Sequence, residues 1–298
     1  MIIKVGTRKS ILAEIQADLV INKLQLRFPD ITFKKVFIQT QGDIDKKTDL
    51  AIIGGQGVFV KKIQQSLISG EIDLAVHSAK DLPSAEVEGL TLAAYTEREI
   101  VTDSLLICGG YRNLMELPKG AIVGTSSLRR RFQISYNRPD IKLNSLRGNI
   151  DTRLKKLKSG QYDAIIMAGA ALRRYNMIKE DKKIIEYILP LQDFLPAPGQ
   201  GAIVVEGRIG DKASIIASEL DKPDVREAVS CERAFLRVFG LGCNSPLAAY
   251  ARKVDDKIIL NAMIGDLKSG KRYDCRIEGK NPEKLGKKAA DILRGDLV

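Results

Sequence analysis

Cys243 has a sequence context that differs from that of the other three cysteines. Within "FGLGCNSPLAA" it lies between Gly242 and an Asn-Ser-Pro turn. Glycine allows a tight backbone turn and Pro246 stops a helix from continuing, so we expect Cys243 to lie on a loop. The other cysteines occupy apolar runs that are typical of packed elements: Cys108, Cys231 and Cys275. Two interpretations stay open for Cys243, a half-buried loop thiol or a reactive or modified one.

A polar segment, "AVHSAKDLPS", follows an apolar run directly. It places His77, Ser78, Lys80 and Asp81 at the end of a strand-like stretch. A carboxylate beside a lysine in that position could accept and return protons or stabilise a cation. The alternative is a solvated loop in which Asp81 caps a turn. The segment alone is compatible with both.

Arginines recur where apolar runs give way to helical patterns. The stretches are "GTRKS", "VGTSSLRRRFQ", "SLRGNIDTRL" and "LRRY". Free amides and hydroxyls at a helix start favour anions, and an arginine can hold a carboxylate through two N–H groups. Two clusters at equivalent strand-to-helix junctions predict an anion-binding cleft. The residues of this pattern are Arg8, Ser10, Ser126, Ser127, Arg129, Arg130, Arg131, Arg147, Gly148, Arg153 and Arg174.

Alternating elements must position these groups. Short apolar runs such as "IIKVG", "DLAVHS" and "YDAIIMAG" alternate with amphipathic stretches through the first two thirds of the chain. This alternation is typical of an α/β fold, with a parallel sheet and helices on both of its faces. Ligands of doubly wound sheets bind at the carboxyl ends of strands. We therefore expect the chemistry in the loops that follow the apolar runs.

Proline and glycine indicate the domain organisation. "FLPAPGQGAIVVEG" resembles a hinge that leads back into a sheet. We expect a first domain over residues 1–98 and 197–216, into which a second domain, 99–196, is inserted. Beyond it, a long helix, hairpin-like strands and a last helix predict a small α+β domain over 218–298, with Cys243 near its start.

Composition restricts the partners. The chain has 298 residues, a net charge of +11 and a pI near 9.4, which favours anionic ligands. It has no tryptophan and only 5% aromatic residues, so base stacking on nucleic acid is poorly supported. A polyanionic small molecule fits the charge at least as well.

The same composition bears on location and on metals. No apolar run approaches the roughly 18 residues of a membrane span, and "MIIKVGTRKS" opens like a strand instead of a signal peptide. We expect a cytoplasmic protein that binds no membrane. Four cysteines without a CxxC pair and a single histidine argue against a disulfide framework and a structural zinc site.

Seven motifs together resemble one family. "TRKS", "GGQGVFVKK", "HSAKDLP", "GTSSLRRR", "LRGNIDTRL", "LPAPGQGA" and "GCNSPLAAYA" follow one another over nearly the whole chain. In this order they are similar to the porphobilinogen deaminases, or hydroxymethylbilane synthases. The resemblance implies two doubly wound, periplasmic-binding-protein-like domains plus a small C-terminal α+β domain, in a monomer. It also implies a transferase of tetrapyrrole biosynthesis whose product passes to uroporphyrinogen-III synthase.

The resemblance assigns a role to the loop cysteine. It implies that Cys243 carries a dipyrromethane cofactor through a thioether bond, and that this cofactor acts as a primer. The enzyme adds four porphobilinogen units head to tail, releases ammonia each time, and then hydrolyses the linear tetrapyrrole away. Asp81 matches the catalytic carboxylate, which assists loss of the amine and stabilises the azafulvenium cation.

The arginines follow from the acetate and propionate groups of porphobilinogen, which fixed guanidinium groups can hold. The resemblance implies that the following residues bind the cofactor: Lys80, Asp81, Ser127, Arg129, Arg130, Arg147, Gly148 and Cys243. It implies that the following bind the substrate: Arg8, Ser10, Asp43, Gln56, Phe59, Arg153, Arg174 and Gln200. No residue is assigned to a metal.

Four positions depart from the family pattern. Gln56 replaces a lysine and Ile52 a basic residue, which weakens carboxylate binding, while Thr102 replaces an arginine and Leu241 a glycine. One alternative function is therefore a paralogue that binds polycarboxylate pyrroles with little or no turnover. Another, motivated by the charge, is a nucleic-acid-binding protein. The presence of both Asp81 and Cys243 favours the enzyme, because a binding protein needs neither.

Overall fold

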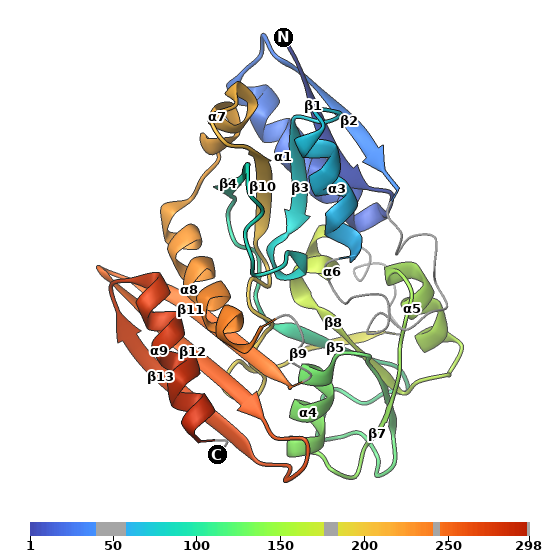
Figure 1. Cartoon of the computed structure of the whole chain (residues 1–298). Coiled ribbons are helices and arrows are strands. Elements are labelled where there is room, and N and C mark those ends of the chain that lie inside the picture. Colours follow the sequence, from blue (N-terminus) through green and yellow to red (C-terminus); the bar gives the residue numbers. More distant parts are fainter. Residues whose placement is uncertain (40–57, 176–183, 241–244, 297–298) are drawn as a thin grey trace.

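The structure, a computed structural model, describes residues 1–39, 58–175, 184–240 and 245–296. Its strands form three sheets, which we call A, B and C; they lie at the top, at the lower right and at the lower left of Figure 1. Within the described ranges, no helix is long and apolar enough to cross a membrane.

Sheet A has the strand order β2-β1-β3-β10-β4. Its strands are β1 Ile2–Arg8, β2 Thr32–Ile38, β3 Leu74–Ser78, β4 Leu90–Tyr95 and β10 Ile203–Arg208. Its helices are α1 Ile11–Arg27, α3 Val58–Ile68 and α7 Lys212–Ser218. Alternate side chains of a strand point to opposite faces, so Leu74 and Val76 pack with α1 and α7 whereas Ala75 packs with α3. Helices therefore cover both faces.

Sheet B has the order β7-β6-β8-β5-β9. Its strands are β5 Asp103–Ile107, β6 Ile122–Gly124, β7 Lys142–Asn144, β8 Ala164–Ala168 and β9 Ile185–Ile188. Its helices are α4 Leu128–Asn137, α5 Ile150–Lys158 and α6 Gly169–Tyr175. Leu105 and Ile107 face the cluster that contains α4 residues, and Leu106 faces the one that contains α5 and α6 residues. The α/β prediction is confirmed for both sheets.

Both sheets are mixed and not wholly parallel. β1 runs parallel to β2 and β3, but β10 is antiparallel to β3 and β4. In sheet B, β6 is parallel to β7 and β8, whereas β5 is antiparallel to β8 and β9. The chain leaves sheet A after β4, builds sheet B and returns with β10. The domain bounds 1–98 with 197–216, 99–196 and 218–298 stay a prediction.

Sheet C is a small antiparallel sheet covered by two helices. Its strands are β11 Leu247–Val254, β12 Lys257–Gly265 and β13 Arg272–Gly279, and its helices are α8 Pro223–Phe239 and α9 Pro282–Gly295. The helices touch closely, because a Cβ on Gly286 would overlap the Cys231 carbonyl oxygen. Cys231 is fully buried in this core, as its apolar run predicted.

Candidate active site

The turn after β3 carries Lys80 and Asp81. A short 3-10 helix, Ala79–Asp81, follows the strand directly. The segment that leads into β10 packs against it, and Ala79 N donates to Ala202 O over 3.0 Å. Gly199 has a φ of 77°, and a Cβ there would lie 3.0 Å from the Lys80 backbone nitrogen. Glycine therefore lets this returning segment approach the turn.

Gln200 connects the turn with β5 of sheet B. Its Oε1 accepts from Lys80 Nζ over 3.3 Å, and its Nε2 donates to Val101 O over 2.8 Å and to Asp103 Oδ1 over 2.9 Å. Burial lowers the pKa of Lys80 from 10.5 to about 8, although the adjacent Asp81 carboxylate opposes this change. Lys80 is thus a cation near neutral pH that loses its charge more readily than an exposed lysine.

Asp103, at the start of β5, holds two arginines of α4. One carboxylate oxygen pairs with Arg129 at 2.8 Å and the other with Arg130 at 2.7 Å. Burial raises the pKa of Asp103, but the two guanidiniums outweigh burial and hold the pKa well below its usual range. Sequence reasoning missed this residue. Its signal is an acidic side chain at the start of the apolar run "DSLLI", because buried aspartates are nearly always paired.

The two arginines differ in what their remaining N–H groups reach. Arg129 donates to Leu195 O over 2.7 Å, and with a side chain only 7% exposed its guanidinium is enclosed by the protein. Arg130 donates to Ile166 O over 3.1 Å. Its Nε is buried and has no hydrogen-bond partner in the described part of the chain. Such a buried donor suits an anionic ligand.

A second arginine group lies at the start of α5. Gly148 has a φ of 113°, which favours glycine, and Asn149 caps the helix by accepting from Thr152 N over 3.0 Å. Arg153 Nε donates to Gly148 O over 2.8 Å. Burial lowers the pKa of Arg153, and the charge of Arg130 adds to this effect, so the two guanidiniums are near enough to interact.

Two more predicted arginines lie near α1 and α6, which contact each other. Arg8 ends β1 and is half-buried, and Ser10 caps α1 by accepting from Ala13 N over 3.4 Å. Arg174 on α6 donates to Gly201 O over 2.6 Å, which joins this helix to the returning segment. Burial lowers the pKa of Arg174.

In the structure, most of the predicted site residues lie just after the carboxyl end of a strand or in the segment that leads into β10. They follow the carboxyl ends of β1, β3, β6, β7 and β8 or lie in the returning segment: Arg8, Ser10, Lys80, Asp81, Ser127, Arg129, Arg130, Arg147, Gly148, Arg153, Arg174 and Gln200. Other positions lie outside the described residues: Asp43, Ile52, Gln56, Leu241 and Cys243. The same holds for the side chain of Phe59, whose backbone belongs to α3.

The arrangement combines buried cations with one exposed carboxylate. Lys80, Arg130 and Arg153 could neutralise the carboxylates of a ligand. Asp81 is exposed, and no hydrogen bond from the described residues ends on its carboxylate, so it does not cap the turn there. Among the described side chains, no three histidines, cysteines or acids cluster as a metal site. The site is therefore suited to bind a polycarboxylate and to transfer protons beside it.

Two family models match the chain. "Porphobilinogen deaminase, dipyromethane cofactor binding domain" matches residues 3–215, and "Porphobilinogen deaminase, C-terminal domain" matches 226–295. The porphobilinogen deaminase of Clostridioides difficile is 40% identical over 98% of this chain and 97% of that protein. That of Brevibacillus brevis is 43% identical over 97% of this chain and 93% of that protein.

Among solved structures, the chain is distantly similar to the periplasmic VFT2 domain of Bordetella pertussis BvgS. The TM-score is 0.43 at 16% identity, over 74% of this chain and 86% of that one. The substrate-binding protein of an amino-acid ABC transporter gives a TM-score of 0.39 at 14% identity, over 76% of this chain and 92% of that one.

Proposed function

The chain belongs to the porphobilinogen deaminase family, and from that premise we propose which of its residues perform the reaction. It is a hydroxymethylbilane synthase, a transferase of tetrapyrrole biosynthesis. It condenses four porphobilinogen molecules head to tail, with loss of ammonia, on a dipyrromethane cofactor and releases the product by hydrolysis. The observation that carries this conclusion is the match of both family models along the chain. The alternative of a paralogue with little or no turnover gains no support from the Clostridioides difficile and Brevibacillus brevis relatives, which both bear the enzyme's name.

The residues near Asp103 fit a cofactor that bears carboxylates. Arg130 keeps a buried Nε–H without a partner in the described part of the chain, and Lys80 and Arg153 add cations. When bound, the dipyrromethane would supply the pyrrole position to which the first porphobilinogen is joined, and each later unit would be joined to the one before it. Its proposed ligands are Lys80, Asp81, Ser127, Arg129, Arg130, Arg147 and Gly148, with Cys243 as the covalent anchor.

Arg129 and Arg130 both pair with Asp103 and donate to a backbone carbonyl, but among the described residues only Arg130 also keeps a buried Nε–H without a partner. We propose that Arg129 contributes mainly charge, and that Asp103 orients Arg130 toward the cofactor carboxylates. A fixed guanidinium binds an anion without first losing conformational freedom.

Asp81 is the proposed catalytic group. Its carboxylate is exposed, and in this role it would move a proton to or from the amine of porphobilinogen and lower the energy of the cation that forms as ammonia leaves. Lys80 lies beside it and balances the charge of ligand carboxylates. The absence of a capping hydrogen bond to Asp81 from the described residues favours this role over that of a turn cap.

Porphobilinogen itself carries an acetate and a propionate. The residues proposed to bind it are Arg8, Ser10, Asp43, Gln56, Phe59, Arg153, Arg174 and Gln200. Support comes from Arg153 and Arg174, whose partly buried guanidiniums donate to backbone carbonyls and keep further N–H groups for a ligand. From the family resemblance we also propose that the enzyme is a cytoplasmic monomer and that it passes hydroxymethylbilane to uroporphyrinogen-III synthase.

Intact-mass measurement under denaturing conditions tests the assignment. We expect the active enzyme to retain two pyrrole units, and peptide mapping to locate them on Cys243. Cys231→Ser serves as the control and should keep the adduct, because Cys231 is buried in the core of sheet C. An adduct on another cysteine, or active enzyme without one, would contradict the proposal.

A further inference from the structure

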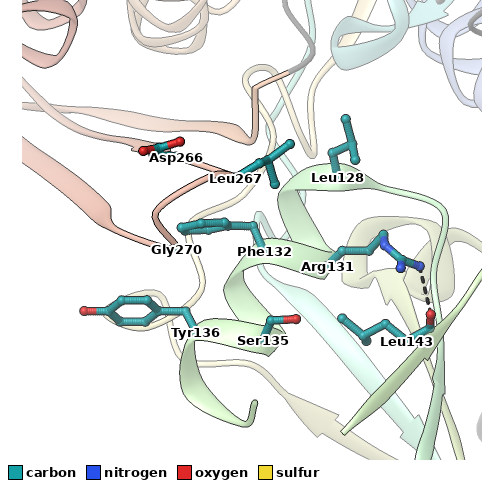
Figure 2. Close-up of a pocket in the computed structure, with 9 residues that line it drawn as sticks. All are labelled: Leu128, Arg131, Phe132, Ser135, Tyr136, Leu143, Asp266, Leu267 and Gly270. Atoms are coloured by element: carbon teal, nitrogen blue, oxygen red, sulfur yellow. Dashed lines mark hydrogen bonds between the residues drawn. The ribbon is translucent and has the colours of Figure 1, made fainter. Parts of the chain in front are cut away.

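The sequence pattern placed Arg131, the third arginine of the "LRRR" run, in the predicted anion-binding cleft, and for this residue the prediction is wrong, because Arg131 does not join Arg129 and Arg130 at Asp103. Successive residues of a helix point about 100° apart, so Arg131 turns away from the neighbours that bind Asp103. It donates to Leu143 O over 3.0 Å (Figure 2). Within the described residues, no carboxylate lies within ion-pair distance of Arg131. Arg131 therefore presents an unbalanced positive charge on a different face of α4.

That face forms one wall of a groove. The groove has a volume of about 300 Å³ and lies between α4, β7 and the loop that joins β12 to β13 (Figure 2). Phe132 lines its interior and is 7% exposed, whereas Leu128, Tyr136 and Leu267 are 42%, 54% and 56% exposed. Three large apolar side chains thus stay accessible around one hollow. Clusters of this kind mark ligand-binding grooves.

One wall of the groove is α4, which packs on sheet B, and the other is the loop that joins β12 to β13 of sheet C. Direct contacts hold these two walls together. A Cβ on Gly265 would lie 2.6 Å from the Phe132 ring, so the end of β12 packs directly on α4. Arg272 of β13 donates to Asp193 O over 2.7 Å, and its guanidinium carbon lies 5.7 Å from the centre of the Tyr136 ring. The groove is therefore built into the packing of sheet C against sheet B.

The two charged residues of the groove lining, Arg131 and Asp266, do not pair with each other. Asp266 accepts hydrogen bonds from Ser269 and Lys268 of its own loop, which lower its pKa, and within the described residues it forms no ion pair with Arg131. The same loop carries the exposed Lys268, which adds positive charge. Arg131 is the lining cation, and no ion pair within the described residues balances it.

We propose that this groove binds a small molecule with one flat ring and one carboxylate. The ring packs against Phe132, Tyr136 and Leu267, and the carboxylate pairs with Arg131. A volume of about 300 Å³ is at the lower end for small-molecule sites and accommodates a single ring with a short side chain. One unbalanced arginine matches one carboxylate, because a second ligand charge would find no fixed partner of its own.

Phenylacetate is the probe for this site, and phenylacetamide is its neutral counterpart. We would titrate each into the holoenzyme by calorimetry, and follow leucine methyl signals by NMR. We expect saturable phenylacetate binding, with shifts concentrated on Leu128, Leu143 and Leu267. The amide should bind about tenfold more weakly, because it loses a charge-assisted contact with Arg131.

Two variants locate the charge. Arg131→Gln should weaken phenylacetate binding about tenfold and bring it to the level of the amide. Lys284→Gln removes the same charge from the exposed start of α9 and should leave binding unchanged. Both variants should retain porphobilinogen turnover, which shows that they are folded. The proposal is overturned if phenylacetate does not bind at millimolar concentration, if Arg131→Gln binds it as tightly as the parent, or if other leucines carry the shifts.

Discussion

At the residue scale, Asp81 offers the sharpest chemical test. Asp81→Asn keeps the size of the side chain but removes its charge and its ability to accept a proton, so turnover should fall steeply at an unchanged melting temperature. Asp81→Glu keeps the charge and should retain measurable turnover, although a displacement of one methylene can lower the rate about a hundredfold. Ammonia release and thermal melting separate the variants. A fully active Asp81→Asn enzyme would leave the chain without an identified catalyst.

Asp103 is the residue on which the arrangement of Arg129 and Arg130 depends. Asp103→Asn leaves two buried guanidiniums without their carboxylate, and breaking such a buried pair destabilises a protein by about 3–5 kcal/mol. We expect a lower melting temperature and a reduced fraction of protein that carries the cofactor by intact mass. Asp140→Asn breaks a more exposed pair with Arg138 and serves as the control. Equal cofactor content and melting temperature in both variants would remove the proposed role of Asp103.

Lys80 predicts a limit to activity at alkaline pH. Its pKa of about 8 means that it loses its charge as the pH rises through that value, so its hold on the carboxylates of the cofactor should weaken and turnover should fall there. Between about pH 8 and pH 10.5 the unfolded chain keeps the Lys80 proton that the folded protein has released, so the contribution of Lys80 to the free energy of unfolding increases with pH. Unfolding at this group therefore does not explain the expected loss of activity. Lys80→Arg keeps its charge and should move the limit to higher pH. An unchanged pH profile in Lys80→Arg would contradict the assignment.

At the scale of elements, Glu232 of α8 joins sheet C to both segments that cross between sheets A and B. Its two oxygens accept from the Arg98 guanidinium at 2.8 and 2.9 Å. They also accept from Gly199 N at 2.6 Å and from Ala251 N at 2.7 Å. The Glu232 side chain is fully buried. Water therefore cannot replace these donors if the hydrogen bonds are broken, and the buried partners would be left unsatisfied.

Glu232→Gln should therefore lower the melting temperature strongly, because it leaves Arg98 as a buried, unpaired cation. The matched control is Glu283→Gln, which removes the exposed pair between Arg237 and Glu283 and should change stability little. Thermal melting of both variants measures the difference. Similar melting temperatures would show that Glu232 does not hold the three sheets together.

At the scale of the whole molecule, the net charge of +11 predicts how salt affects the reaction. Raising KCl from about 0.01 M to about 1 M shortens the Debye length from about 30 Å to about 3 Å, which screens the attraction of porphobilinogen carboxylates. The KM should rise over this range while kcat stays nearly constant. Sucrose at equal osmolality provides the control. A KM that is independent of salt would show that charge does not assist substrate binding.

Many of the strands and helices, and the polar segments that follow them, could be predicted from local sequence patterns. Runs such as "LTLAAY", "AIVGTS" and "YDAIIMAG" form β4, β6 and β8, because hydrophobic periodicity and capping are local properties. Ser10 and Ser127 cap α1 and α4 for the same reason. The order of the motifs also identified the family, which the family models confirm.

The partners of these side chains, in contrast, depend on the packing of distant segments and could not be predicted from the sequence. Three consecutive arginines look alike in sequence, yet Arg129 and Arg130 bind Asp103 while Arg131 lines a groove beside sheet C. Helical geometry points successive side chains in different directions, and the groups that receive them come from distant parts of the chain. Glu232 likewise meets its donors across the fold, and the mixed sheets arise because β10 returns antiparallel. Local patterns do not encode such contacts, because they depend on how the packed elements are arranged in space.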